Sequence, residues 1–319
     1  MEKKPLVILT GPTAAGKTAL SLKLARAIGG EIVSADSMQV YRHMDIGSAK
    51  IRPEEMQGIA HHLIDVLMPW EEFNVVRFQQ LAKQACAGIW ERGHIPIVAG
   101  GTGFYIQALL YDIDFTENDA DTSVREKWEK LAKEQGGQVL YERLLQIDPA
   151  SAAAIHKNNT KRMIRALEFY EQTGTPISAH NEEQRRRKSP YCFLYAVLTR
   201  ERAELYERID RRVEQMLQKG LLKEVETLKE MGCTRQMTAM QGLGYKEMLD
   251  YLEGRLSWEE AVYTIKRDTR HFAKRQLTWF RREPEAVFFS MDAKEETQVL
   301  AELLARLKTE RITDKNEGR

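Results

Sequence analysis

The chain has 319 residues, of which 43% are hydrophobic and 30% are charged, and its formal net charge is +1. This composition is that of an ordinary globular protein with one large or two modest domains, and the net charge neither requires nor excludes a nucleic-acid partner. No stretch reaches the roughly 18 apolar residues of a membrane span, so the sequence predicts a protein without a membrane anchor. The three cysteines are far apart, which favours a reducing, cytoplasmic compartment and no disulfide framework.

Short β-rich runs alternate with helical patterns over the first hundred residues. Continuous apolar runs predict buried strands, and apolar residues at three- and four-residue spacing predict helices. The predicted strands are residues 6–9, 31–34 and 95–99, and the predicted helices are residues 18–28 and 74–92. Strands that alternate with helices form a doubly wound parallel sheet, and ligands bind such sheets at the carboxyl ends of the strands. The sequence therefore predicts an α/β fold.

The β signal disappears between about residue 115 and residue 190, where the chain is helical and charged. The predicted core positions of this segment are Trp128, Leu131, Leu140, Leu144, Leu145, Ile164 and Leu167. Strands are expected again at residues 191–198 and 286–289, with helices between them. We therefore expect an all-helical insertion, residues 115–190, between the two parts of the α/β core, residues 1–114 and 191–319.

The turn between the first predicted strand and helix carries a phosphate-binding motif. Its residues are Gly11, Pro12, Thr13, Ala14, Ala15, Gly16, Lys17 and Thr18, which match the pattern G-x-x-x-x-G-K-[ST] in the strand-to-helix context that this motif requires. The two glycines let the backbone curl so that successive N–H groups point at one anion, and the helix adds its positive N-terminal end. Lys17 supplies a charge, and the Thr18 hydroxyl can complete the shell of a Mg²⁺ ion. The sequence therefore predicts a P-loop that holds a di- or triphosphate.

The position of the nearest acid limits the chemistry of this loop. Motor-type ATPases place an acid at the end of a later strand to hold the metal, whereas strand 95–99 runs into Gly100, Gly101 and Thr102. The acid Asp36 follows the second strand instead, and no Asn-Lys-x-Asp segment for guanine is present. The sequence therefore argues against a motor ATPase and against a GTPase. A small-metabolite or nucleotide kinase and a non-catalytic RNA-binding nucleotide switch remain open interpretations.

Further segments, spread in order from residue 6 to about residue 283, match one protein family together with the phosphate-binding loop. They are Ser34-Ala35-Asp36-Ser37-Met38-Gln39-Val40-Tyr41, His61-His62-Leu63-Ile64-Asp65, Gly100-Gly101-Thr102-Gly103-Phe104-Tyr105, Arg162-Met163-Ile164-Arg165-Ala166-Leu167-Glu168, Gln241-Gly242-Leu243-Gly244-Tyr245-Lys246-Glu247 and Thr269-Arg270-His271-Phe272-Ala273-Lys274-Arg275-Gln276. With these segments the chain closely resembles the bacterial tRNA dimethylallyltransferase family, also called isopentenyl-tRNA transferase. Ala60 stands where that family usually has proline, and Gly242-Leu243 replaces a common Ala-Ile.

The resemblance implies that a dimethylallyl group is transferred from dimethylallyl diphosphate to the exocyclic N6 amine of the adenine 3′-adjacent to the anticodon. The P-loop would then grip the diphosphate leaving group, where negative charge builds as the allylic carbon–oxygen bond breaks. The amine becomes acidic only as it attacks, so a carboxylate must take its proton, and Asp36 is the candidate general base. The alternatives for Asp36 are Mg²⁺ ligation, together with Thr18, or a cap on the next helix.

The same resemblance assigns further residues to the site. Thr102 is expected to hydrogen-bond near the reacting amine or the diphosphate and to act in catalysis with Lys17 and Asp36. Arg212 matches the family's diphosphate-binding arginine, with Arg211 one position away as the alternative and a solvated helix face as a third interpretation. The segment 36–39 is expected to read an extruded adenine, because Gln39 offers both a donor and an acceptor. Ordinary turn and loop side chains are the alternatives for Thr102 and Gln39.

Basic residues gather locally despite the near-zero net charge. Residues 266–282 combine lysines and arginines with aromatic residues, which suits a phosphate backbone and unstacked bases, although a solvated helix face is the alternative. The residues expected to contact tRNA are Asp36, Ser37, Met38, Gln39, Thr102, Arg125, Lys161, Arg162, Arg165, Gln241, Lys274 and Arg275. The expected partners are thus the tRNA anticodon stem-loop and dimethylallyl diphosphate, with Mg²⁺ as cofactor and a monomeric protein. The paired His61 and His62 lack acidic or cysteine partners at ligand spacing and are expected to be structural.

Overall fold

Six parallel strands form one sheet, in the order β3-β2-β4-β1-β5-β6. The computed structural model describes residues 3–115, 123–292 and 295–313. The strands are β1 (Lys4–Thr10), β2 (Gly30–Ser34), β3 (His61–His62), β4 (Ile95–Gly100), β5 (Tyr191–Thr199) and β6 (Ala286–Ser290). The predicted α/β fold is therefore confirmed. The sequence missed β3, because two residues are too short to produce a pattern.

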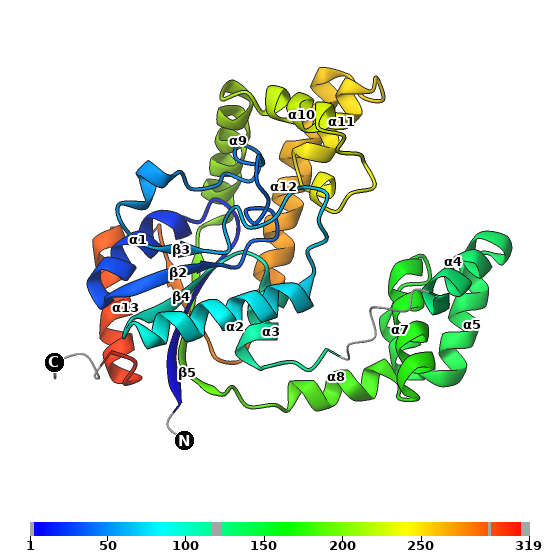
Figure 1. The fold of residues 1–319 in the computed structure, drawn as a ribbon, viewed down its shortest axis with the longest axis horizontal. Helices are drawn as coiled ribbons and strands as arrows, with labels where there is room; N and C mark the ends of the chain where they lie inside the picture. The colour runs from blue at the N-terminus through cyan, green and yellow to red at the C-terminus, as the bar shows by residue number, and fades with distance from the viewer. Residues whose placement is uncertain (1–2, 116–122, 293–294, 314–319) are drawn as a thin grey trace. The chain divides into compact units, whose positions relative to one another are not determined.

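Strand β1 lies in the middle of the sheet and is buried on both faces. Residues 6–9 have no exposed surface, which explains why they form a continuous apolar run instead of alternating with polar residues. The helices that pack around the sheet are α1 (Lys17–Ile28), α2 (Val75–Glu91), α3 (Gly103–Leu110) and α13 (Glu296–Thr309). Val7 and Leu9 join α1 and α13 in one apolar cluster. Helix α2 covers the opposite face, and α3 packs against it (Figure 1).

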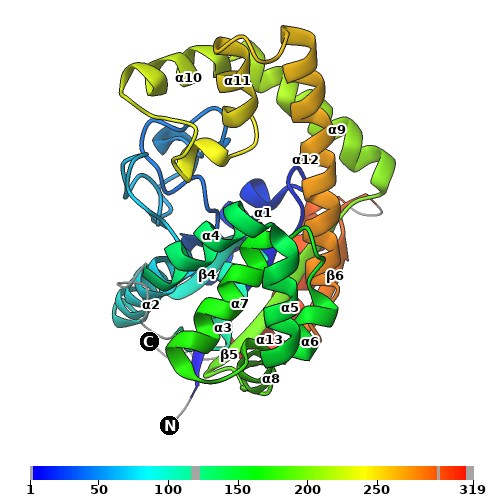
Figure 2. The ribbon, with the colours of Figure 1, turned by 90° about the vertical axis from the view of Figure 1, so that its right-hand side faces the viewer.

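A second group of helices follows β5. Its members are α9 (Arg202–Gln218), α10 (Leu221–Glu230), α11 (Tyr245–Leu252) and α12 (Trp258–Phe280). Apolar contacts of Leu205 and Ile209 with Ala273 join α9 to α12, and Arg270 donates two hydrogen bonds of 2.7 Å to the carboxylate of Asp210. Helices α10 and α11 pack on each other and on this pair, as Figure 1 and Figure 2 show. Although α12 has 23 residues, no helix in the described part of the chain is long and apolar enough to cross a membrane.

Residues Tyr111–Ser189 form a compact unit of their own, separate from the unit that contains the sheet. Its described helices are α4 (Ser123–Gln135), α5 (Gly137–Ile147), α6 (Pro149–Ala154), α7 (Thr160–Thr173) and α8 (Ile177–Arg185). Residues 116–122, which belong to the predicted insertion, lie outside the described residues. The core of this unit contains Trp128, Leu140, Leu144, Ile164 and Leu167, with Leu131 partly buried.

The prediction that Leu145 belongs to this core is wrong, since 48% of Leu145 is exposed. Leu144 is fully buried on the same helix. Neighbouring residues of a helix point in directions about 100° apart because each turn holds about 3.6 residues. With Leu144 turned into the core, Leu145 lies about 100° further round α5, on a side that is exposed.

A buried carboxylate ties the edge of the sheet together. Glu31 of β2 is 4% exposed. It accepts hydrogen bonds of 2.9 and 2.7 Å from Arg92 and hydrogen-bonds with His62 and His94 at 2.7 Å each. The hydrogen bond from Arg92 is the largest of the effects that lower the pKa of Glu31 to about 2. His62 thus has the structural contact that the sequence favoured.

This cluster predicts a pH-dependent stability. The pKa of Glu31 is lower in the folded protein than its usual value of 4.5. The contribution of Glu31 to the unfolding free energy is therefore complete above pH 4.5 and is lost as the pH falls toward 2. We expect chemical denaturation to show that the parent protein loses about 2 kcal/mol more unfolding free energy than Glu31→Gln between pH 6 and pH 3. Glu230→Gln, at an exposed position of α10, is the control and should behave like the parent protein. Equal pH dependence of Glu31→Gln and the parent protein would contradict this account.

Candidate active site

The phosphate-binding loop connects β1 to α1 through backbone conformations that a side chain would obstruct. Gly11 has φ 148°, and a Cβ atom there would lie 2.5 Å from the carbonyl oxygen of Leu198 in β5. Gly16 precedes α1 at φ 108°. Ala14 is left-handed at φ 63°, a conformation that costs about 1–2 kcal/mol for a residue with a side chain. The loop thus curls tightly around the N-terminus of α1, as an anion cradle requires.

The ammonium group of Lys17 lies within this loop. Its Nζ donates hydrogen bonds to the carbonyl oxygens of Gly11 at 2.9 Å and Pro12 at 2.8 Å. The pKa of Lys17 is lowered to about 7, chiefly by burial and also by the charge of Arg212, while Asp36 acts in the opposite direction. These three charged groups therefore lie within electrostatic range of one another. An anion bound among them would stabilise the charged form of the lysine.

Asp36 follows the end of β2 and faces the same place. Its Oδ1 accepts a hydrogen bond of 2.9 Å from the backbone N–H of Met38, so the carboxylate caps its own turn. Asp36 also counteracts the effect of burial on the pKa values of Lys17 and Arg212. Strands β1 and β2 both pair with β4, so their ends bring Lys17 and Asp36 together, while Arg212 comes from α9.

The end of β4 passes so close to β2 that only glycine fits. A Cβ atom on Gly100 would lie 2.2 Å from the carbonyl oxygen of Ala35, the residue before Asp36. The backbone N–H of Thr102 donates to that same oxygen at 3.1 Å, and its carbonyl oxygen accepts from Tyr105 at the start of α3. Thr102 is thereby held beside Asp36. The absence of an acid at this strand end reflects the space that the neighbouring backbone leaves.

A cleft of about 850 Å³ joins these groups. The residues predicted from the sequence that line it are Thr13, Ala14, Gly16, Lys17, Thr18, Asp36, Ser37, Met38, Gln39, Thr102, Arg212, Gln241 and Arg275. Gly11, Pro12 and Ala15 are buried within the loop, and Lys274 is exposed on α12. An anion cradle with a carboxylate and an arginine beside it can bind a diphosphate and place a proton acceptor next to it.

Comparison with known proteins shows the family to which this chain belongs. Residues 39–283 match the family described as IPP transferase, and residues 4–66 match the one described as isopentenyl transferase. The chain belongs to the IPP transferase family. A protein of Lachnoclostridium phytofermentans named tRNA dimethylallyltransferase is 58% identical over 310 residues, which are 97% of this chain and 99% of that protein. The resemblance predicted from the sequence is therefore confirmed.

Solved structures of the family share the fold. The full-length tRNA isopentenylpyrophosphate transferase of Bacillus halodurans has a TM-score of 0.73 at 43% identity, and the match covers 97% of this chain and 98% of that one. A eukaryotic dimethylallyltransferase described as acting on tRNA has a TM-score of 0.84 at 28% identity, covering 99% of this chain and 81% of its own. The IPP transferase fold thus extends over both units of the chain.

Of the two adjacent arginines of α9, Arg212 is partly buried and lines the cleft. Its charge acts on Lys17, and Asp36 acts on it in turn. Arg211 also lines the cleft, but it is exposed and pairs with Glu207 at 2.6 Å. The structure therefore favours Arg212.

The two glutamines predicted to contact tRNA are already engaged within the protein. The amide oxygen of Gln39 accepts from the Ser34 hydroxyl at 3.2 Å, and its Nε2 donates to the Ser48 carbonyl oxygen at 3.4 Å. Gln241 is exposed, and its Nε2 donates to the carbonyl oxygen of Arg235. For Gln39 this arrangement favours the loop-amide alternative over base reading.

The basic residues of the helical unit fall into two classes. Lys161 and Arg162 are exposed on α7. Arg125 and Arg165 instead form ion pairs with Glu168, at 3.1 and 3.5 Å, and the side chain of Glu168 is 4% exposed. A buried carboxylate needs such partners, so these two arginines stabilise the unit whether or not they also contact RNA.

Sequence reasoning missed Gln276, which connects the two loops of the site. The side chain is buried on α12. Its Oε1 accepts the backbone N–H of Thr13 at 2.9 Å, and its Nε2 donates to the carbonyl oxygen of Gly101 at 2.9 Å. A Cβ atom on Gly101 would lie 2.2 Å from that nitrogen. Gln276 belongs to one of the family segments, but nothing local in the sequence indicates this contact.

Two further arginines support the loop from outside. Arg200 donates to the carbonyl oxygen of Ala15 at 3.2 Å and pairs with Asp292 at 2.7 Å. Arg208 of α9 donates to the carbonyl oxygen of Ala14 at 3.0 Å. By donating to these two carbonyl oxygens, the side chains of Arg200 and Arg208 help to hold the loop in its conformation.

We expect Gln276→Met to weaken the binding of inorganic diphosphate about tenfold, because it leaves the Thr13 N–H and the Gly101 carbonyl oxygen buried without a partner. Isothermal titration calorimetry measures this affinity. The matched control is Thr278→Val, since the Thr278 hydroxyl is exposed and bonds only to the Lys274 carbonyl oxygen of its own helix. An unchanged affinity in Gln276→Met would show that the loop holds its shape without this bridge.

Proposed function

We propose that the chain transfers a dimethylallyl group from dimethylallyl diphosphate to the N6 amine of the adenine 3′-adjacent to the anticodon of a tRNA. Membership of the IPP transferase family supports the reaction class. The observation that carries the proposal for the site is the convergence of Lys17, Asp36 and Arg212 in one cleft. A diphosphate in the cradle and a carboxylate beside it are the two requirements of this substitution.

The anion cradle is the part of the site that holds the leaving group. As the allylic carbon–oxygen bond breaks, negative charge accumulates on the diphosphate. The N-terminal end of α1 and the ammonium group of Lys17 would face that charge. Arg212 adds a planar guanidinium, which binds phosphate oxygens in pairs. Each of these contacts strengthens as the bond lengthens, so they favour the transition state over the bound donor.

The carboxylate of Asp36 is the part of the site that acts on the nucleophile. In the proposed reaction the N6 amine forms a bond to the allylic carbon and gives one proton to the carboxylate of Asp36. The hydrogen bond from the Met38 N–H holds one oxygen of this carboxylate in place. Thr102, fixed through the carbonyl oxygen of Ala35, lines the same cleft as Asp36, and its proposed role is to orient the amine or the diphosphate.

The oxygen donors of the site fit Mg²⁺. No group of three or more His, Cys, Asp or Glu side chains gathers around a metal position in the residues described. Thr18 and Asp36 line the same cleft, and Mg²⁺ prefers one or two protein oxygens with substrate phosphates and waters. Bound there, the ion would neutralise charge on the departing diphosphate.

A kinase function is not favoured. Strand β4 ends in glycine, and the space beside Ala35 admits no acidic side chain there. One cleft contains the complete set of proposed catalytic residues, so we propose a monomer. Because its substrate is tRNA, we propose that it acts in the cytoplasm.

The proposal is tested by incubating the protein with labelled dimethylallyl diphosphate and tRNA. Label transfer to RNA is the expected result, with no ATP hydrolysis in the absence of RNA. Rapid ATP cleavage with no transfer of the isoprenoid would refute the proposal.

Asp36→Asn separates the base from the metal-ligand role. A lost general base lowers the transfer rate by about 10³-fold, while the affinity for dimethylallyl diphosphate, measured by equilibrium binding, should stay close to that of the parent protein. In contrast, Lys17→Met should lose donor affinity. If Asp36→Asn lost donor affinity together with turnover, metal ligation would be the better account.

Lys161 and Arg162 test the role of the helical unit in RNA binding. We expect Lys161→Gln and Arg162→Gln each to weaken tRNA binding and to flatten the plot of log affinity against log salt concentration by about 0.7–0.9 for each phosphate that is no longer neutralised. Donor affinity should not change. Arg125→Gln is the contrasting variant, because it weakens the ion pairs of Glu168 and should lower the unfolding free energy of the unit. Unchanged salt dependence in both exposed-site variants would place tRNA elsewhere.

A further inference from the structure

The segment between Met38 and Lys50 forms one wall of the cleft without a helix or strand of its own. It contributes Met38, Gln39, Gly47, Ser48 and Ala49 to the lining. Backbone N–H groups in such a segment need partners from elsewhere. The partners that this segment finds therefore determine where the wall stands.

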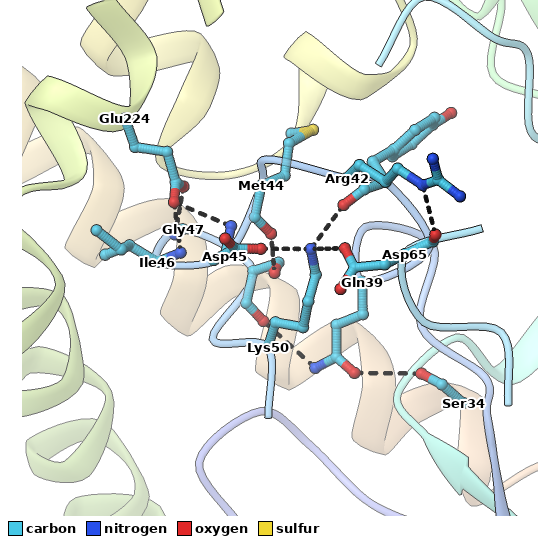
Figure 3. A network of polar contacts seen from close by, with 12 residues as sticks. Ser34, Gln39, Arg42, Met44, Asp45, Ile46, Gly47, Lys50, Asp65 and Glu224 are labelled. Carbon is cyan, nitrogen blue, oxygen red and sulfur yellow. Dashed lines mark hydrogen bonds and ion pairs between the residues drawn. The ribbon is translucent and has the colours of Figure 1, made fainter. Parts of the chain in front are cut away.

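Glu224 of α10 supplies the first set of partners, as Figure 3 shows. Its Oε2 accepts the N–H groups of Asp45 at 2.9 Å and Ile46 at 2.7 Å, and its Oε1 accepts that of Gly47 at 3.1 Å. Three successive N–H groups that converge on one carboxylate form an anion-binding nest. Here the protein's own side chain fills the nest.

Tyr245 of α11 extends this contact by one residue. Its hydroxyl donates to Glu224 Oε1 at 2.7 Å and accepts the Ser48 N–H at 3.1 Å. Burial, helped by the charge of Glu224, raises the pKa of Tyr245, so the hydroxyl keeps the proton that it donates. The ring leaves no room at Gly47, where a Cβ atom would lie 2.5 Å from its Cζ.

Lys50 holds the same segment from the other side. Its ammonium group, with 3% of the side chain exposed, contacts Asp45 and Asp65 at 2.6 Å and the Tyr41 carbonyl oxygen at 2.7 Å (Figure 3). These partners lie in the loops that follow β2 and β3. The contacts of Glu224 and Tyr245 differ, because they link the segment to the helices on the opposite side of the cleft.

We propose that Glu224 is a positioning residue, which with Tyr245 latches the 45–48 segment to α10 and α11 and thereby sets the width of the cleft. Asp36 stands at the start of the latched wall, and Arg212 stands on α9, next to α10 in the chain. The latch therefore fixes the distance between the proposed proton acceptor and the groups on the leaving side. A misplacement of about 1 Å between reacting groups costs about 100-fold in rate. This inference rests on the proposed function.

Hydrogen exchange tests the latch without any substrate. In Glu224→Gln one acceptor oxygen becomes an NH₂ donor, so at least one of the nest N–H groups loses its partner. We expect the amides of Asp45, Ile46 and Gly47 to exchange about tenfold faster or more than in the parent protein. The matched control is Glu226→Gln on the same helix, where Glu226 pairs with exposed Lys223 at 3.2 Å. Unchanged exchange in Glu224→Gln would overturn the proposal.

Kinetics test whether the latch positions the reacting groups. Glu224→Gln should lower kcat by about 10- to 100-fold with little change in KM for dimethylallyl diphosphate, because the P-loop is built independently of α10. Tyr245→Phe should give a smaller loss, and the double variant should lose less than the two effects combined, because both side chains act through one contact. Thermal unfolding of every variant confirms that it is folded.

The outcomes are distinguishable. Faster exchange with an unchanged kcat would leave Glu224 a purely structural residue and overturn the inference. Equal kinetic losses in Glu226→Gln would do the same. If the parent protein transfers no isoprenoid, the proposed function fails, and hydrogen exchange alone then decides whether the latch exists.

Discussion

The close approach of neighbouring strand ends is the constraint on which the site depends. Gly11 lies against the carbonyl oxygen of Leu198, and Gly100 lies against that of Ala35, with space for no side chain in either place. These two contacts bring the P-loop, Asp36 and Thr102 together at the carboxyl ends of the parallel strands. A larger residue at either position would separate the anion cradle from the carboxylate, and the remaining side chains would have nothing to act on together.

Charge is distributed around these strand ends in a way that suits an anion. Lys17 and Arg212 are two partly desolvated cations, and Asp36 is the carboxylate that acts on both. Desolvated like charges repel, which lowers the pKa of the lysine. A bound diphosphate would relieve that repulsion. The supporting arginines Arg200 and Arg208 bind loop carbonyl oxygens and so strengthen the cradle, and Arg208 also lines the cleft.

The sequence predicted what depends on neighbours in the chain. The strands other than β3, the P-loop and the place of Asp36 after β2 follow from local patterns. The contacts of Gln276 with Thr13, of Arg200 with Ala15 and of Glu224 with Ile46 join residues 263, 185 and 178 positions apart, which no local pattern reveals. The hydrogen-bond partners of individual side chains could not be predicted either. Gln39 has chemistry suited to reading a base, yet its amide is bonded to Ser34 and Ser48.

The position of the acid explains how a P-loop can serve substitution at carbon. In phosphoryl transfer the attacked atom is phosphorus, so charge-stabilising groups surround the phosphate that moves. In the proposed reaction the diphosphate stays in the cradle while the attacked carbon lies outside it. The base must then stand beside the cradle and away from the phosphate, which is the place that β2 gives to Asp36. An acid at the end of β4 would instead meet the backbone of Ala35.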